Sequence, residues 1–140
     1  MFILDTNVIS ELRHGKLNQS PEVRKWAAVQ STGGLFLSVI TILELEKGIL
    51  TLERRVPPQG SALRIWLSGV RSAFAGRILP LTDHAATICA ALHVPDPRSE
   101  RDAMIAATAI EHGFTVVTRK MQDFVSTGVP LLNPWSETVP

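Results

Sequence analysis

Four acidic side chains stand where a parallel β-sheet could bring them together. Asp5 ends an apolar run at the N-terminus, and Glu44 follows shortly after a second apolar run. Asp102 begins the helical segment that precedes a further apolar run, and Asp123 lies shortly after that run. Strands of a parallel sheet are buried on both faces, and their carboxyl ends open onto the crevice where ligands bind. The spacing therefore predicts an acidic cluster at one edge of a sheet.

The predicted cluster has the composition of a site for a hard cation. Like charges raise one another's pKa values unless a cation neutralises them. The ligands are oxygens, and no His or Cys stands at metal-binding spacing, so Mg²⁺ or Mn²⁺ fits better than Zn²⁺. The predicted chemistry is hydrolysis of a phosphodiester by a metal-activated water molecule. Two threonines at strand ends would hold a carboxylate or a water in place. The predicted catalytic residues are Asp5, Glu44, Asp102, Asp123, Thr6 and Thr118, and the four acids are the predicted metal ligands.

Each acid also has a purely structural explanation. Asp5 could cap the helix that follows it. Glu44 and Asp102 each stand three residues after a Thr or Ser and complete a capping-box pattern. Asp123 could cap a short turn. One acid is more easily explained in this way than four, so the shared site remains the leading interpretation.

The elements that would position these residues alternate between short apolar strands and helices. We expect strands at 2–4, 35–38, 78–81, 114–117 and 130–132. We expect helices at 8–13, 21–30, 41–52, 61–75, 82–92 and 103–110, a helical turn before Phe124, and a loop at 57–60. Strands separated by helices pair in parallel through right-handed crossovers. The predicted fold class is α/β, a three-layer α/β/α domain over residues 1–140 with a short-stranded parallel sheet flanked by helices.

The composition sets limits on size, charge and compartment. A chain of 140 residues with 45% hydrophobic residues can bury a core without disulfides or structural metal. The net charge of +1 gives no global attraction to nucleic acid, so a polyanion would need a local patch. The single Cys89 excludes an intramolecular disulfide and is expected to be a small buried core residue. Asp5 interrupts the first apolar run, so we expect no export signal or membrane anchor and a cytoplasmic protein.

Several segments, taken together, resemble the successive motifs of PIN-domain proteins. They are DTN at 5–7, SVITILELEKG at 38–48, RDAMIAATA at 101–109 and TRKMQDF at 118–124. The closing segment GVPLLNPW at 128–135 is similar to the FitB branch of VapC-type toxins. The resemblance covers nearly the whole chain, and the order and spacing of the motifs are more specific than any one of them.

The resemblance implies a metal-dependent endoribonuclease that acts as the toxin of a type II toxin–antitoxin pair. By position in the motifs, Asp5, Glu44 and Asp102 would be the core metal-binding acids and Asp123 the fourth. It also implies an RNA substrate, a cognate antitoxin that covers the acidic cleft, and a homodimer. An Arg or Lys of the antitoxin would pair with the carboxylates and displace the metal.

Apolar residues on two predicted helices are available for contact with the antitoxin, although a core would require the same spacing. On the helix bearing Glu44 they are Leu45, Ile49 and Leu52, and on the next helix they are Leu63, Trp66, Leu67 and Val70.

Two departures from the family pattern keep alternatives open. Lys120 stands where the family usually has Asn, so a cation beside the acidic pocket is predicted to weaken metal binding. The segment 92–102 is also shorter than usual, so a different approach to the site is expected. A catalytically weak PIN-like module that binds RNA or protein is therefore the alternative function. A phosphatase of the haloacid dehalogenase type ranks lower, because it expects a second Asp where Asn7 stands.

Overall fold

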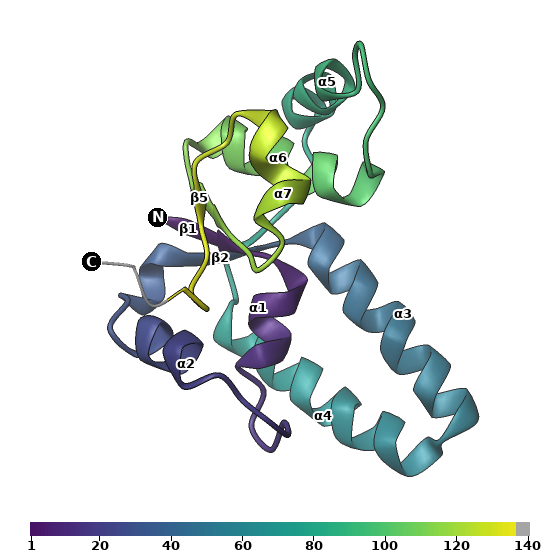
Figure 1. The fold of residues 1–140 in the computed structure, drawn as a ribbon. Helices are drawn as coiled ribbons and strands as arrows, with labels where there is room; N and C mark the ends of the chain where they lie inside the picture. Colours follow the sequence, from purple (N-terminus) through teal and green to yellow (C-terminus); the bar gives the residue numbers. More distant parts are fainter. Residues whose placement is uncertain (137–140) are drawn as a thin grey trace.

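Five strands form one parallel sheet in the order β3-β2-β1-β4-β5 (Figure 1). The structure is a computed structural model that describes residues 1–136; residues 137–140 of the predicted domain lie outside the described part. The strands are β1 (Phe2–Leu4), β2 (Leu35–Ser38), β3 (Ile78–Leu79), β4 (Thr115–Val117) and β5 (Leu131–Leu132). All four neighbouring pairs are parallel. The predicted parallel α/β sheet is confirmed, and β1 is its central strand.

Helices connect and flank the strands. They are α1 (Thr6–Glu11), α2 (Pro21–Ala28), α3 (Val39–Arg55), α4 (Pro57–Ala73), α5 (Asp83–Leu92), α6 (Glu100–His112) and α7 (Met121–Phe124), with 3₁₀ turns η1 (Thr32–Gly34) and η2 (Val125–Thr127). Within residues 1–136, none of these helices has the length and apolar character needed to span a bilayer.

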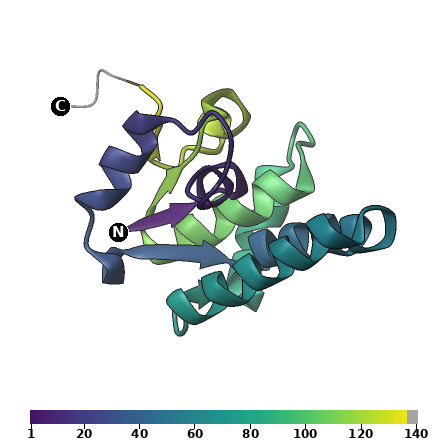
Figure 2. The ribbon, with the colours of Figure 1, turned by 90° about the horizontal axis from the view of Figure 1, so that it is seen from below.

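Two apolar clusters, one on each face of the sheet, make up the core. Alternate residues of a strand point to opposite faces. Ile3 joins Ile105 of α6 in one cluster, which also includes α7. Leu4 joins Val8 of α1 and Leu67 of α4 in the other, which also includes α2. The two clusters confirm the three-layer arrangement, and Figures 1 and 2 show helices on both sides of the strands.

Helix α3 begins directly at the end of β2, which corrects the predicted N-cap at Thr41. Ser38 is the N-cap, and its Oγ accepts a hydrogen bond from the backbone N–H of Ile40 at 3.0 Å. Thr41 lies buried in the first turn instead. Since a Ser that ends a strand can cap a helix at once, the true cap lies three residues earlier than the capping-box pattern suggested. Glu44 therefore plays no part in a cap and is free to reach across to another element.

The predicted loop at Pro57-Pro58-Gly60 is also wrong, because these residues form the first turn of α4. Proline fits the first turn of a helix, where its missing N–H would have had no partner in any case. The expected cap of α6 is confirmed, since Ser99 Oγ accepts a hydrogen bond from the backbone N–H of Asp102 at 3.4 Å.

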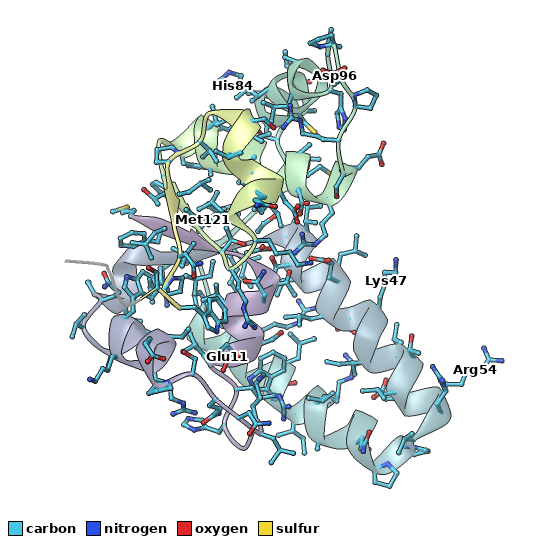
Figure 3. The ribbon with its side chains drawn as sticks, in the orientation of Figure 1. Glu11, Lys47, Arg54, His84, Asp96 and Met121 are labelled. Atoms are coloured by element: carbon cyan, nitrogen blue, oxygen red, sulfur yellow. The ribbon has the colours of Figure 1, made fainter. Side chains whose placement is uncertain are left out.

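Helices α3 and α4 form an antiparallel hairpin, side by side in Figure 2. Arg64 of α4 pairs with two acids of α3, with Nη1 at 2.7 Å from Glu46 Oε2 and Nη2 at 2.9 Å from Glu53 Oε1. Lys47 and Arg54 point away from the hairpin instead (Figure 3). The ion pairs tie the two helices together near the middle of the hairpin.

Helix α5 lies outside the main core and contacts α6 along its length. Its one fully buried residue is Ala85. Cys89 is therefore half-buried, which corrects the expectation of a small core residue.

Candidate active site

Asp5 lies at the carboxyl end of the central strand and is fully buried. Its Oδ1 accepts the backbone N–H of Thr6 at 2.8 Å, and Asp5 is the N-cap of α1. Its Oδ2 accepts Thr118 Oγ1 at 2.8 Å and Asn7 Nδ2 at 3.1 Å. Asp5 therefore caps a helix, as its structural explanation predicted, and also faces the edge of the sheet where β4 ends.

Glu44 reaches the same edge from the second turn of α3. Thr6 Oγ1 donates a hydrogen bond to Glu44 Oε1 at 2.6 Å and lies 3.3 Å from Thr41 Oγ1. The direct passage from β2 to α3 places these turns beside the end of β1. Thr6 thus donates to one carboxylate of this edge and Thr118 to another.

Asp102 completes the group from the first turn of α6, where it is 6% exposed. Burial raises the pKa of Asp102, and the nearby carboxylates of Asp5 and Asp123 raise it further, against the opposing effect of Arg101. The ionised form of Asp102 is therefore costly without a neighbouring cation.

The guanidinium of Arg101 lies among these carboxylates. Its Nη2 is 2.6 Å from Asp5 Oδ1, its Nε contacts Glu44 Oε2, and its Nη1 contacts Asp102 Oδ1. Burial lowers the pKa of Arg101, but the carboxylates of Asp5 and Glu44 outweigh burial and raise it overall. One cation of the chain itself thus holds all three acids.

Sequence reasoning did not identify Arg101 as a site residue. A signal was present, because a cation in the first turn of a helix is disfavoured by the helix dipole and needs an anionic partner there.

Asp123 does not join the inner group. It lies on α7 and is exposed, yet it is near enough to raise the pKa of Asp102. Helix α7 is a single turn whose buried residue is Phe124, and Asp123 lies on its exposed side. Lys120 precedes α7, and its backbone N–H donates to Thr118 Oγ1 at 3.0 Å. Within residues 1–136, the ammonium of Lys120 forms no ion pair.

Two cavities open beside the acids and share Glu44. One, of about 410 Å³, is lined by Thr6, Asn7, Glu44, Ser99, Arg101, Asp102 and Lys120. The other, of about 280 Å³, lies between α1, α3 and α4 and is called here the apolar groove; it is lined by Ser10, Arg13, Lys16, Glu44, Leu45, Gly48, Ile49, Leu52, Leu63 and Trp66. Five of the seven apolar residues predicted to be available to an antitoxin line this groove. Leu67 and Val70 lie in the core instead.

The donor set suits a hard divalent ion, although it is not a closed metal cage. Three carboxylates from β1, α3 and α6 meet at one point that already holds a positive charge. With the guanidinium of Arg101 in place, no three His, Cys, Asp or Glu side chains among the described residues are arranged to hold a metal ion. The guanidinium of Arg101 stands between these acids, so a metal ion would have to take its place.

A buried Asp at the end of the central strand, joined by acids from the helices on either side, defines an α/β protein with a carboxylate-lined site at its sheet edge. The PIN domain model matches residues 2–123. The chain belongs to the PIN-domain family, and within it to the VapC- and FitB-like toxins of toxin–antitoxin systems. This assignment confirms the resemblance and leaves no place for the phosphatase alternative.

Relatives match the chain over nearly its whole length. VapC ribonuclease Y4jK of Sinorhizobium fredii is 38% identical over 96% of this chain and 98% of its own. Toxin FitB of Neisseria gonorrhoeae is 34% identical over 98% of this chain and 100% of its own. The solved structure of FitAB bound to the IR36 DNA fragment is similar at 31% identity and a TM-score of 0.84, and covers 99% of each chain. VapC nucleases with a PIN domain are typically metal-dependent.

Proposed function

We propose that this chain is a metal-dependent endoribonuclease, acting as one PIN-like domain and as the toxin of a type II toxin–antitoxin pair. The observation that supports it is the convergence of Asp5, Glu44 and Asp102 at the carboxyl edge of the sheet. The proposed place of action is the cytoplasm, because the RNA substrate and the antitoxin are synthesised there.

The residues divide into ligands and groups that orient them. Asp5, Glu44 and Asp102 would hold Mg²⁺ or Mn²⁺, and Asp123 would complete the set from the rim of the cavity. When bound, such an ion supplies Lewis acidity toward a phosphate and lowers the pKa of a water molecule. Two threonines keep the first two carboxylates in position, since Thr118 donates to Asp5 and Thr6 to Glu44.

The proposed partners are a cognate antitoxin and a second copy of the chain. The apolar groove would take an apolar segment of the antitoxin, and Glu44 at its end would bring that segment to the acidic cleft. A basic side chain of the antitoxin could then pair with the carboxylates. The homodimer would form through other helices, so that the groove remains available.

A weakly active module that binds RNA or protein is the second candidate function. The observation that favours it is Arg101, which occupies the point where the three acids meet. A titration with Mg²⁺ and Mn²⁺ in an RNA cleavage assay separates the two functions. Metal-dependent cleavage supports the toxin nuclease, and RNA binding without cleavage at any metal concentration supports the module.

Asp5→Asn tests the active site directly. It should reduce cleavage by about 100-fold or more and relieve growth arrest on expression, while the amide oxygen still caps α1 and preserves the fold. Asp96→Asn is the matched control, because Asp96 is exposed on a loop beyond α5, far from the sheet edge (Figure 3). The control should cleave like the parent. An Asp5→Asn protein with parental activity would show that the site is assigned wrongly.

A further inference from the structure

All acceptor positions of the Asp5 carboxylate are in use. Oδ1 accepts the Thr6 N–H at 2.8 Å and Arg101 Nη2 at 2.6 Å. Oδ2 accepts Thr118 Oγ1 at 2.8 Å and Asn7 Nδ2 at 3.1 Å. An ionised carboxylate offers about four lone-pair positions. A divalent ion can therefore reach Asp5 only by displacing one of these four donors.

Arg101 is the donor that can leave. The Thr6 N–H belongs to the backbone at the start of α1, and Thr118 is fully buried. Asn7 is held from both sides, because its Oδ1 also accepts the backbone N–H of Arg119 at 3.3 Å. Arg101, in contrast, has a long side chain that is 25% exposed. It also lines the cavity of about 410 Å³, which gives the guanidinium space to move into.

The same displacement would free the other two acids. Glu44 Oε2 and Asp102 Oδ1 contact Arg101, while Glu44 Oε1 is engaged by Thr6. Among the described residues, Asp102 Oδ2 is the one oxygen of the three carboxylates without a hydrogen-bond donor. When the guanidinium turns away, one oxygen on each of Asp5, Glu44 and Asp102 is released at the same point.

We propose that Arg101 is the resident cation of the active site, and that Arg101 and a divalent ion occupy Asp5 in turn. The proposal rests on the metal site of the proposed function. Without a divalent ion, Arg101 neutralises three acids that would otherwise repel one another, and it fixes their side chains. Arg101 is thus a positioning residue that sets the affinity of the site for its ion.

Lys120 provides an internal comparison. It lines the same cavity, yet within residues 1–136 it forms no ion pair with an acid. Lys120 can influence an incoming ion only through space, whereas Arg101 must be displaced from direct contact. Removal of Arg101 is therefore expected to change metal affinity more than removal of Lys120.

Mn²⁺ binding measured by electron paramagnetic resonance tests the proposal without using activity. The variants are Arg101→Gln, Arg101→Lys, Lys120→Gln and Asp5→Asn. Arg54→Gln is the matched control, because Arg54 is exposed and points away from the α3–α4 hairpin at the far end of α3 from Glu44 (Figure 3). Arg101→Gln should bind Mn²⁺ at least about ten-fold more tightly than the parent, since a displaced contact of unit charge is lost. Arg101→Lys should lie between the two, since it keeps the charge but not the fork that reaches three acids. Arg54→Gln should match the parent.

Thermal unfolding supplies the second measurement. In EDTA, Arg101→Gln should melt below the parent, and saturating Mn²⁺ should raise its melting temperature by more than that of the parent. Equal Mn²⁺ affinity in folded Arg101→Gln, Arg101→Lys and parent, with Asp5→Asn abolishing binding, would overturn this proposal and leave the metal site intact. Failure of every variant and the parent to bind Mn²⁺ would overturn the metal site as well.

Discussion

Buried Glu11 shows how a single residue can link two helices. It ends α1, where its Oε2 accepts the backbone N–H of Ser20, the N-cap of α2, at 2.7 Å. Its Oε1 lies 3.1 Å from Lys16 Nζ. Burial alone would raise the pKa of Glu11, but the Ser20 N–H and the Lys16 charge outweigh it, so the pKa lies below its usual value of 4.5. The ionised carboxylate is therefore the form that stabilises this corner (Figure 3).

We expect Glu11→Gln to lower stability in a pH-dependent way. At pH 7 the loss should be about 1 to 2 kcal/mol, because a charged hydrogen bond to a buried backbone N–H is weakened. A carboxyl with a lowered pKa in the folded state stabilises the protein above its unfolded pKa, and that contribution is lost as the pH falls through the folded value. The difference in stability from the parent should hence be largest near neutrality. It should shrink as the pH falls below 4.5.

Chemical unfolding followed by circular dichroism from pH 3 to pH 7 measures this difference. Asp96→Asn makes the same change in net charge on an exposed loop and should follow the parent throughout. A Glu11→Gln deficit that is constant across the range would mean that the charge of Glu11 is not the stabilising feature.

The residues of the site were predictable to the extent that backbone topology determines them. Asp5, Glu44 and Asp102 converge because parallel strands present their carboxyl ends, and the helices that follow or precede them, at one edge. The role of Arg101 was not predictable from topology. Its position next to Asp102 places both residues on one helical turn, but it does not say which way the Arg101 side chain points. Which long side chain turns inward depends on tertiary contacts with Asp5 and Glu44.

At the scale of elements, the close approach of α3 and α4 depends on Gly60. A Cβ built on Gly60 would lie 2.5 Å from the backbone N of Glu53 and 2.6 Å from its Cα. Backbone atoms cannot move aside as a flexible side chain can. A Cβ on Gly69, also in α4, would meet nothing within 4 Å. The two glycines thus serve as a contact position and an open position on one helix.

Alanine at these positions should have opposite effects. Gly60→Ala should destabilise the protein by about 1 to 3 kcal/mol or more, because overpacking pushes the two helices apart. Gly69→Ala should stabilise it by about 0.5 to 1 kcal/mol, because alanine favours a helix interior. Urea titration of both variants checks the pair. If Gly60→Ala were as stable as the parent, the hairpin could not be packed as closely as the structure shows.

The strands were predicted more accurately than the helix ends. Short apolar runs between polar segments mark β1 and β2 at the residues where the structure has them. The starts of α3 and α4 were placed too late, because Ser38 both ends a strand and caps a helix, and because Pro57 begins a helix although a Pro-Gly segment favours a loop. Each of these residues has two local roles, and packing against the sheet decides between them.

At the scale of the whole molecule, the sheet order places the apolar groove and the acidic cavity side by side. Strand β2 is adjacent to β1, so α3 passes over the end of β1 before it pairs with α4. Glu44 consequently lines both cavities. A partner seated in the groove would thus touch a proposed metal ligand, so an antitoxin bound there would also inhibit the proposed cleavage.

Gly48→Gln should separate binding of the antitoxin from cleavage of RNA. Gly48 lines the groove, and a Cβ there would meet nothing within 4 Å, so glutamine fits the folded chain while its side chain fills space that the antitoxin needs. The affinity for the cognate antitoxin should fall about ten-fold or more, which corresponds to a loss near 1.4 kcal/mol. RNA cleavage by the variant alone should equal that of the parent, and the antitoxin should no longer silence it.

Gly69→Gln is the control, because it makes the same substitution at an open helix position away from the groove. Light scattering of the chain alone and mixed with antitoxin reports the dimer and the complex in the same experiment. A Gly48→Gln protein that binds and is inhibited like the parent would show that the antitoxin does not use this groove.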